Sequence, residues 1–161
     1  MSRWAKREEA ASTRRKSWAI GVGLMSWTIL GIGPCGPIPG GSLPNGEASG
    51  VVQDWSFVNE AKRCAVEVRP ADPHSVTVNC MSWQGRLFVS CSKCEGKDWS
   101  GYALAEPSAR IEIGNRVYPA QIARITEPDE LDEIWRARAE KLGNDPEPRA
   151  EGWWTFELRS R

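Results

Sequence analysis

The chain has 161 residues, which leaves room for one globular domain and an appendage. Charged side chains make up 26% of it and apolar ones 40%, a balance that argues against a disordered protein. The formal net charge is zero, but residues 1–16 carry six basic and only two acidic side chains. The rest of the chain is therefore mildly acidic, which argues against nucleic acid as a partner.

A basic cluster followed by an uncharged apolar run lies near the N-terminus. Arg14, Arg15 and Lys16 directly precede residues 17–33, which contain no charged side chain. At about 1.5 Å per residue, a helix of this length is at the lower limit for crossing a membrane. A basic flank keeps its own end in the cytoplasm and directs the following chain outward. We therefore interpret residues 1–33 as a signal or anchor segment with a hydrophobic helix.

This segment predicts a domain outside the cytoplasm, on the periplasmic or extracellular side, that stays attached to the membrane. Three fates of the segment remain open. It is retained as a signal anchor, it is a signal peptide cleaved near Gly33, or Cys35 is lipidated after cleavage as in bacterial lipoproteins. Pro34 is a poor neighbour for that cleavage. A buried helix of a soluble domain is disfavoured because the run contains four glycines.

Residues 34–50 are rich in glycine and proline and contain few apolar side chains after Ile38. Such a stretch buries no core and is typical of a linker. We expect the globular domain to start near Val51 and to comprise residues 51–161.

Alternation of apolar and polar side chains predicts six strands in this domain. The predicted strands are residues 64–69, 75–81, 86–91, 109–113, 117–123 and 153–159. Short turns at residues 83–85 and 114–115 join two pairs of them into hairpins.

Two helices are predicted between these strands. Residues 99–106 form one or two turns that stop at Pro107. Pro128 begins a longer helix, with carboxylates in its first turns, and Gly143 ends it after Leu142. The fold class is therefore mainly β with one or two helices (α+β), a six-stranded antiparallel barrel that is closed or split.

Adjacent tryptophans at the last strand favour self-association. Trp153 and Trp154 must point to opposite faces of a strand, so one of them is expected outside the core. An exposed tryptophan is typical of an interface. We therefore predict a dimer.

The five cysteines allow metal, redox and disulfide roles. Cys91 and Cys94 have C-x-x-C spacing, but the sequence around them lacks the features of redox motifs, and no second such pair completes a zinc site. We predict no metal. In an exported domain, a Cys91–Cys94 or Cys64–Cys80 disulfide is favoured over both other roles, and plain buried thiols are the main alternative.

His74 is the single histidine of the chain. Its ordinary pKa lies near neutrality, so it is a candidate acid or base. No serine-nucleophile motif or paired carboxylate accompanies it, which favours a surface or hydrogen-bonding role. The catalytic residues therefore stay unknown.

The best candidate for a binding site is the loop of residues 90–97. It places the hydroxyls of Ser90 and Ser92 and the ammonium groups of Lys93 and Lys97 ahead of a predicted helix. A phosphate group needs cationic and hydroxyl donors near a helix start. The loop therefore suits a phosphate group, with a solvated surface loop as the alternative.

The order of these elements resembles the split β-barrel flavin-binding family, which includes pyridoxamine-phosphate oxidases and deazaflavin-dependent nitroreductase-like proteins. The resemblance covers residues 54–161. The matching segments are residues 87–90, 92–97, 99, 104–113 and 116–125, followed by the acidic helix start at 127–130. Glu106 stands where the family usually has asparagine.

The resemblance implies a flavin site between two subunits, and hence a homodimer. The serines and lysines of loop 90–97 would hold the flavin phosphate. The strand that carries Ser75, Thr77 and Asn79 would lie against the isoalloxazine edge, and Trp99 would cover the ring. The cofactor would be FMN, with deazaflavin or none as alternatives.

The function implied is a flavin-dependent oxidoreductase of unknown substrate. The alternative is a non-catalytic binding or structural module that kept the barrel and lost the cofactor. The departures from the family pattern at Glu106 and in the basic loop 90–97 favour this alternative.

Overall fold

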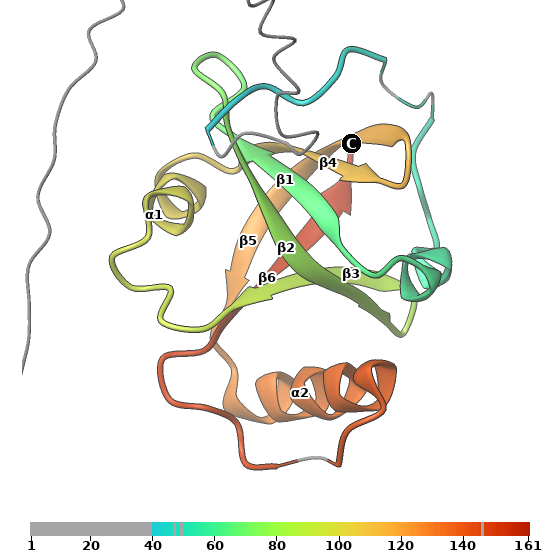
Figure 1. Ribbon diagram of the computed structural model, residues 1–161, viewed down its shortest axis with the longest axis vertical. Coiled ribbons are helices and arrows are strands. Elements are labelled where there is room, and N and C mark those ends of the chain that lie inside the picture. The colour runs from blue at the N-terminus through green and yellow to red at the C-terminus, as the bar shows by residue number, and fades with distance from the viewer. Residues whose placement is uncertain (1–39, 47, 49, 146) are drawn as a thin grey trace, which may run out of the picture. The chain divides into compact units, whose positions relative to one another are not determined.

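The computed structural model describes residues 40–46, 48, 50–145 and 147–161 (Figure 1). The predicted N-terminal segment 1–33 and the lipidation site at Cys35 lie outside the described residues. Among the residues that are described, no helix is both long and apolar enough to cross a membrane.

Six antiparallel strands form a closed barrel in the order β1-β2-β3-β6-β5-β4. Their bounds are β1 (Cys64–Val68), β2 (His74–Trp83), β3 (Arg86–Cys91), β4 (Ser108–Ile113), β5 (Arg116–Ile125) and β6 (Trp154–Ser160). Closure gives every strand two neighbours, so no sheet edge is left open. The α+β barrel predicted from the sequence is confirmed.

In the described part of the chain, three helices accompany the barrel. A short 3₁₀ helix, η1 (Ser56–Glu60), precedes β1, α1 (Asp98–Ala105) follows β3, and α2 (Pro128–Leu142) connects β5 to β6. Figure 1 shows α1 and α2 on different sides of the barrel. Gly143 ends α2 in the left-handed conformation at φ 66°, and its N–H donates to the carbonyls of Ala139 and Glu140.

Side chains of two hydrophobic clusters fill the inside of the barrel and the space under α2. Inside the barrel, fully buried side chains include Val66, Leu87, Val89, Ile111 and Phe156. On the outer side of β2 and β3, a second cluster consists of Met81, Phe88, Leu131, Ile134 and Trp153. Strand alternation explains both clusters, since successive side chains point to opposite faces.

The tryptophan argument for a dimer was wrong. Trp153 is 5% exposed, because α2 covers it and Trp135 packs edge-on against it with ring centroids 4.8 Å apart. Trp154 is half-buried, and the guanidinium of Arg124 lies 3.7 Å from its ring centroid. Both indoles are covered by their own chain, so neither indicates a partner. The dimer itself stays a prediction.

Part of the predicted linker packs on the barrel. Leu43 is buried against Ala65 and Val117, so the expectation that this stretch buries nothing does not hold there. The Leu43 N–H donates to the carboxylate of Glu67, and the Ala48 N–H donates to the Val117 carbonyl. The segment therefore lies along the outer side of β1 and β5.

Two disulfides cross-link the barrel, and both are pairings that the sequence suggested. Cys64–Cys80 joins β1 to β2 with a Cα–Cα distance of 5.9 Å. Cys91–Cys94 joins the end of β3 to the loop before α1, with a Cα–Cα distance of 5.6 Å.

Arg86 links α2 to the barrel through two carboxylates. Its Nε donates to Glu157 on β6 over 2.8 Å, and its Nη1 donates to Glu130 on α2 over 2.6 Å. Arg159 also donates to Glu157. Burial alone would raise the pKa of Glu157, but the hydrogen bonds from Arg86 and Arg159 outweigh burial and hold this pKa below its ordinary value.

We expect the contribution of Glu157 to stability to be lost in acid. A carboxyl group with a lowered pKa in the folded state stabilises the fold above its unfolded pKa of about 4.3, and this contribution disappears as the pH falls through the folded pKa. Glu157→Gln should therefore lower the free energy of unfolding at about pH 7 much more than at about pH 3. Urea unfolding at both pH values measures the two differences. Equal differences would show that the Glu157 charge does not stabilise the fold.

Candidate functional site

An open hollow lies where β2 and β3 meet the loop before α1. Its volume is about 270 Å³. We call it the β2–β3 hollow. It is lined by Arg63, Thr77, Val78, Asn79, Ser90, Cys91, Ser92, Lys97 and Trp99.

Strand register brings the polar residues of the β2–β3 hollow together. Asn79 of β2 lies opposite Ser90 of β3. Thr77 is two residues from Asn79 and so shares its face of the strand, away from the barrel interior. Cys64 pairs with Val78, which places the preceding Arg63 beside Asn79.

The loop after β3 returns to supply the second cation of the hollow. Lys97 is the N-cap residue of α1. The loop turns back through Lys93 and Gly96, whose φ angles of 50° and 84° lie in the left-handed region. The hollow is therefore built from two strands and a helix start.

The electrostatic character of the β2–β3 hollow is positive. Arg63 and Lys97 line it, and no carboxylate does. In the described part of the chain, neither cation forms an ion pair. A narrow slot on the α2 side shares Asn79 and Ser90 with the hollow and adds more cations, among them Lys62. Such a surface attracts anions.

Lys141 also lines this slot but has a structural role. Its Nζ donates to the carbonyls of Val58, Ala61 and Cys80 over 3.0, 2.7 and 2.6 Å. Burial lowers the pKa of Lys141. These contacts tie the end of α2 to η1 and β2. The ammonium group of Lys141 therefore uses its hydrogen bonds within the fold.

Most of the binding residues predicted from the sequence line the β2–β3 hollow, namely Thr77, Asn79, Ser90, Ser92, Lys97 and Trp99. Ser75 does not, because it is buried near the start of β2 and its carbonyl accepts a hydrogen bond from Gly40. Lys93 does not line it either. Its backbone lies beside Gly152, and its side chain is exposed.

Trp99 has a different role from the one predicted. It is 5% exposed and packs against Phe156 in the barrel interior, with ring centroids 5.3 Å apart. An indole held there forms part of the floor of the hollow. It is not available to cover a flavin ring.

Arg63 was missed in the sequence because it precedes its strand and belongs to no motif. The Cys64–Cys80 disulfide brings the start of β1 near this part of β2, and the observed register, in which Cys64 pairs with Val78, puts Arg63 beside Asn79. The disulfide alone would not have given this register, because direct pairing of Cys64 with Cys80 would place Arg63 opposite Met81.

His74 lies away from the β2–β3 hollow. It is half-buried, and its ring meets Tyr102 edge-on with centroids 5.5 Å apart. No group of three histidine, cysteine, aspartate or glutamate side chains in the described residues is arranged to hold a metal ion.

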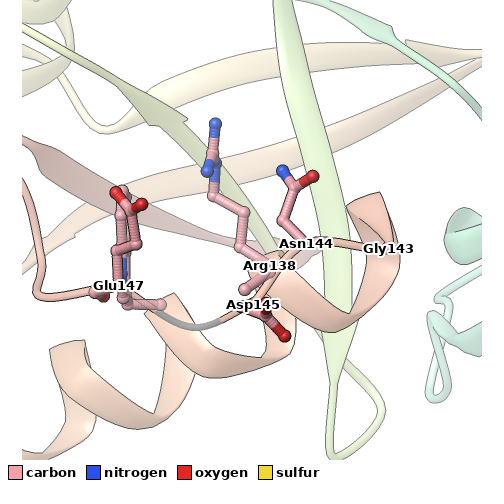
Figure 2. A pocket seen from close by; sticks show the side chains of 7 residues that line it. Arg138, Gly143, Asn144, Asp145 and Glu147 are labelled. Carbon is pink, nitrogen blue, oxygen red and sulfur yellow. The ribbon is translucent and has the colours of Figure 1, made fainter.

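A larger hollow of about 570 Å³ lies at the end of α2. Figure 2 shows Arg138 and Asn144 pointing to the same side of this hollow. Trp135 also lines it, and the Arg138 guanidinium lies 5.0 Å from the Trp135 ring centroid. Because Asp145 and Glu147 line it as well, its charge is mixed. It therefore suits a phosphate less well than the β2–β3 hollow.

No protein-family model matches this chain, and no curated protein sequence does. Solved structures do match its fold. A candidate 5-nitroimidazole antibiotic resistance protein from Bacteroides thetaiotaomicron VPI-5482 superposes with a TM-score of 0.54 at 10% identity, over 71% of this chain and 84% of that one.

Two further structures give the same result. A candidate pyridoxamine 5′-phosphate oxidase from Listeria innocua has a TM-score of 0.53 at 9% identity, over 65% of this chain and 88% of that one. A conserved hypothetical protein from Mycobacterium tuberculosis has a TM-score of 0.53 at 12% identity, over 72% and 86%. At these identities the similarity establishes the fold, and the resemblance to split β-barrel proteins is confirmed at that level.

Proposed function

We propose that the β2–β3 hollow binds the phosphate of FMN or a related flavin, and that the protein is a flavin-dependent oxidoreductase of unknown substrate. One observation carries this proposal. Arg63 and Lys97, which have no carboxylate partner among the described residues, line the same hollow as hydroxyl and amide donors, and no described carboxylate lines it. The name of the Listeria innocua structure, pyridoxamine 5′-phosphate oxidase, supports the oxidoreductase class.

The donor set of the hollow fits a phosphate group. A guanidinium and an ammonium group give charge-assisted hydrogen bonds, which are about twice as strong as neutral ones. Ser92 and Thr77 add hydroxyl donors, and the Asn79 amide adds two N–H groups. Lys97 caps α1, so the positive end of that helix lies beside the hollow.

A bound flavin would supply the hydride and electron transfer of the reaction. The contribution of the chain is to hold and orient it. Arg63 and Lys97 would neutralise the phosphate, and Asn79 and Ser90 would fix its position against the paired strands. No residue of the described chain is assigned to proton transfer.

The size of the hollow supports a homodimer. At about 270 Å³ it is smaller than the usual range for small-molecule sites, roughly 300–1,000 Å³. A complete flavin needs further walls, which we propose a second copy of the chain provides. Sedimentation of the full chain in detergent at tens of micromolar should then give the mass of a dimer. A monomer that still binds FMN would rule out a shared site.

A cofactor-free binding module is the second candidate. The burial of Trp99 favours it, because the aromatic cover expected for a flavin ring is missing from this chain. Titration calorimetry of FMN into the full chain distinguishes the two functions. We expect a dissociation constant in the micromolar range for the flavin protein. If no heat of binding appears up to about 1 mM FMN, the flavin proposal fails and the module takes its place.

Export with membrane attachment is part of the same proposal. Two disulfides favour an oxidising compartment, and the basic cluster before residues 17–33 favours outward transfer of the domain. Fractionation of cells tests it. Recovery of the chain in the soluble cytosolic fraction alone would reject it.

A further inference from the structure

The Cys91–Cys94 disulfide lies in the wall of the β2–β3 hollow. Cys91 stands between Ser90 and Ser92, and all three residues line the hollow. We propose that this disulfide is a site of thiol–disulfide exchange with an external dithiol, and that its reduction weakens ligand binding in the hollow. The inference rests on the proposed function, since the ligand considered is the flavin phosphate.

Cys94 anchors the loop between β3 and α1. It is fully buried, and its carbonyl accepts the Lys97 N–H over 3.1 Å and the Ser100 hydroxyl over 2.5 Å. Cys91 is fixed in the barrel, opposite Trp154 on β6. The disulfide therefore ties the start of α1, and Lys97 with it, to the end of β3.

Other contacts also hold this part of the chain. Trp99 anchors α1 in the barrel interior, and Sγ of Cys94 lies 2.7 Å from the Cys91 carbonyl, to which a free Cys94 thiol would donate. The Cys94 N–H donates to the Gly152 carbonyl over 3.4 Å, a long hydrogen bond. Once the disulfide is broken, the loop between Cys91 and Trp99 depends on these contacts. Lys97 and Ser92 are then less firmly placed relative to Ser90 and Arg63. A less preorganised site binds its ligand more weakly.

The two disulfides differ in access. Cys64 and Cys80 are each 3% exposed and belong to the core cluster. Cys91 is partly exposed. A dithiol should therefore reduce Cys91–Cys94 first.

A second hollow borders the Cys91–Cys94 disulfide, but Cys94 itself is fully buried, so an external thiolate reaches Cys91 rather than Cys94. Cys94 borders an open hollow of about 460 Å³ beside α1. Leu104, which is 52% exposed, lines the same hollow. The disulfide thus lies between two hollows that open to solvent.

The exchange balances in two steps. A thiolate of the external dithiol attacks Sγ of Cys91, and the electron pair of the broken S–S bond leaves with Sγ of Cys94, which takes a proton. The second thiol of the reagent then displaces Cys91 as a thiolate, which is protonated in turn. The protein gains two thiols and the reagent gains one disulfide.

Reciprocity gives the proposal a second readout. If reduction weakens flavin binding by about tenfold, the bound flavin must favour the disulfide over the dithiol by the same factor. For a two-electron couple, tenfold corresponds to about 30 mV in the reduction potential. Saturating FMN should therefore lower the potential of Cys91–Cys94 by about this amount.

The test uses the full chain with Cys35→Ser, which removes the fifth cysteine. FMN affinity is measured by calorimetry before and after equilibration with dithiothreitol, and alkylation with mass spectrometry reports which cysteines are free. The Cys91→Ser/Cys94→Ser variant should bind FMN like the reduced protein, about tenfold more weakly than the oxidised one.

Four results decide the matter. Weaker binding with only Cys91 and Cys94 alkylated supports the inference. Equal affinity in both states, or earlier reduction of Cys64–Cys80, overturns it and leaves the proposed function standing. Absence of FMN binding in the oxidised state overturns both.

Discussion

Replacing Glu67 with glutamine is expected to lower the free energy of unfolding by about 3–5 kcal/mol, because it breaks a buried ion pair. Glu67 is fully buried, and its two oxygens accept bonds from Nε and Nη2 of Arg110, each over 2.7 Å. The same carboxylate accepts the Leu43 N–H over 2.6 Å. The amide removes the charge that compensates Arg110 in a poorly solvated position.

Urea unfolding followed by tryptophan fluorescence measures this effect. Glu112→Gln is the matched control, since Glu112 lies on the neighbouring strand and also points away from the barrel interior. We expect the control to change the free energy of unfolding by less than about 0.5 kcal/mol. Equal midpoints for the two variants would show that the Glu67–Arg110 pair is not needed for stability.

A second comparison separates the loss of the pair from the loss of one partner. The double variant Glu67→Leu/Arg110→Leu leaves no buried charge behind, so it should be less destabilised than Glu67→Gln. It also removes the acceptor of the Leu43 N–H. Any remaining loss therefore reports how much the segment around Leu43 contributes.

Replacing Lys97 with glutamine is expected to weaken FMN binding by about ten- to hundredfold, since a charge-assisted contact is worth roughly 1.5–3 kcal/mol. Lys97 lines the β2–β3 hollow at the start of α1, whereas Lys93 of the same loop lies outside it. Lys93→Gln is therefore the matched control, with the same change of charge. It should bind FMN within about twofold of the wild type, with a small difference due to long-range attraction.

Neither lysine variant should alter thermal stability, because exposed lysines contribute little to folding. The salt dependence of FMN binding should flatten for Lys97→Gln alone. If both variants weaken binding equally, the ligand is attracted by the net charge of the loop and is not held in the β2–β3 hollow.

The elements that the sequence predicted well have local signals. The helix from Pro128 to Leu142 begins at a proline and ends before a glycine with positive φ, and both signals act within one turn. The turn between β2 and β3 ends in Gly85, which also has positive φ. Strand alternation then placed Thr77, Asn79 and Ser90 on one face.

The features that the sequence did not predict depend on tertiary packing. Whether Trp153 is exposed depends on α2, which covers it, and no local pattern describes that contact. The conformation of the loop before Trp99 directs its side chain into the barrel interior. Leu43 lies in a glycine- and proline-rich stretch, but its side chain is buried because it packs against Ala65 and Val117 on the barrel.

Comparison of FMN with riboflavin tests the central claim most directly, because the two ligands differ only in the phosphate. The account predicts that the full chain binds FMN about ten- to hundredfold more tightly than riboflavin, and that this advantage shrinks in the Arg63→Gln/Lys97→Gln variant. Equal affinities of the wild-type chain for FMN and riboflavin would contradict a phosphate site in the β2–β3 hollow.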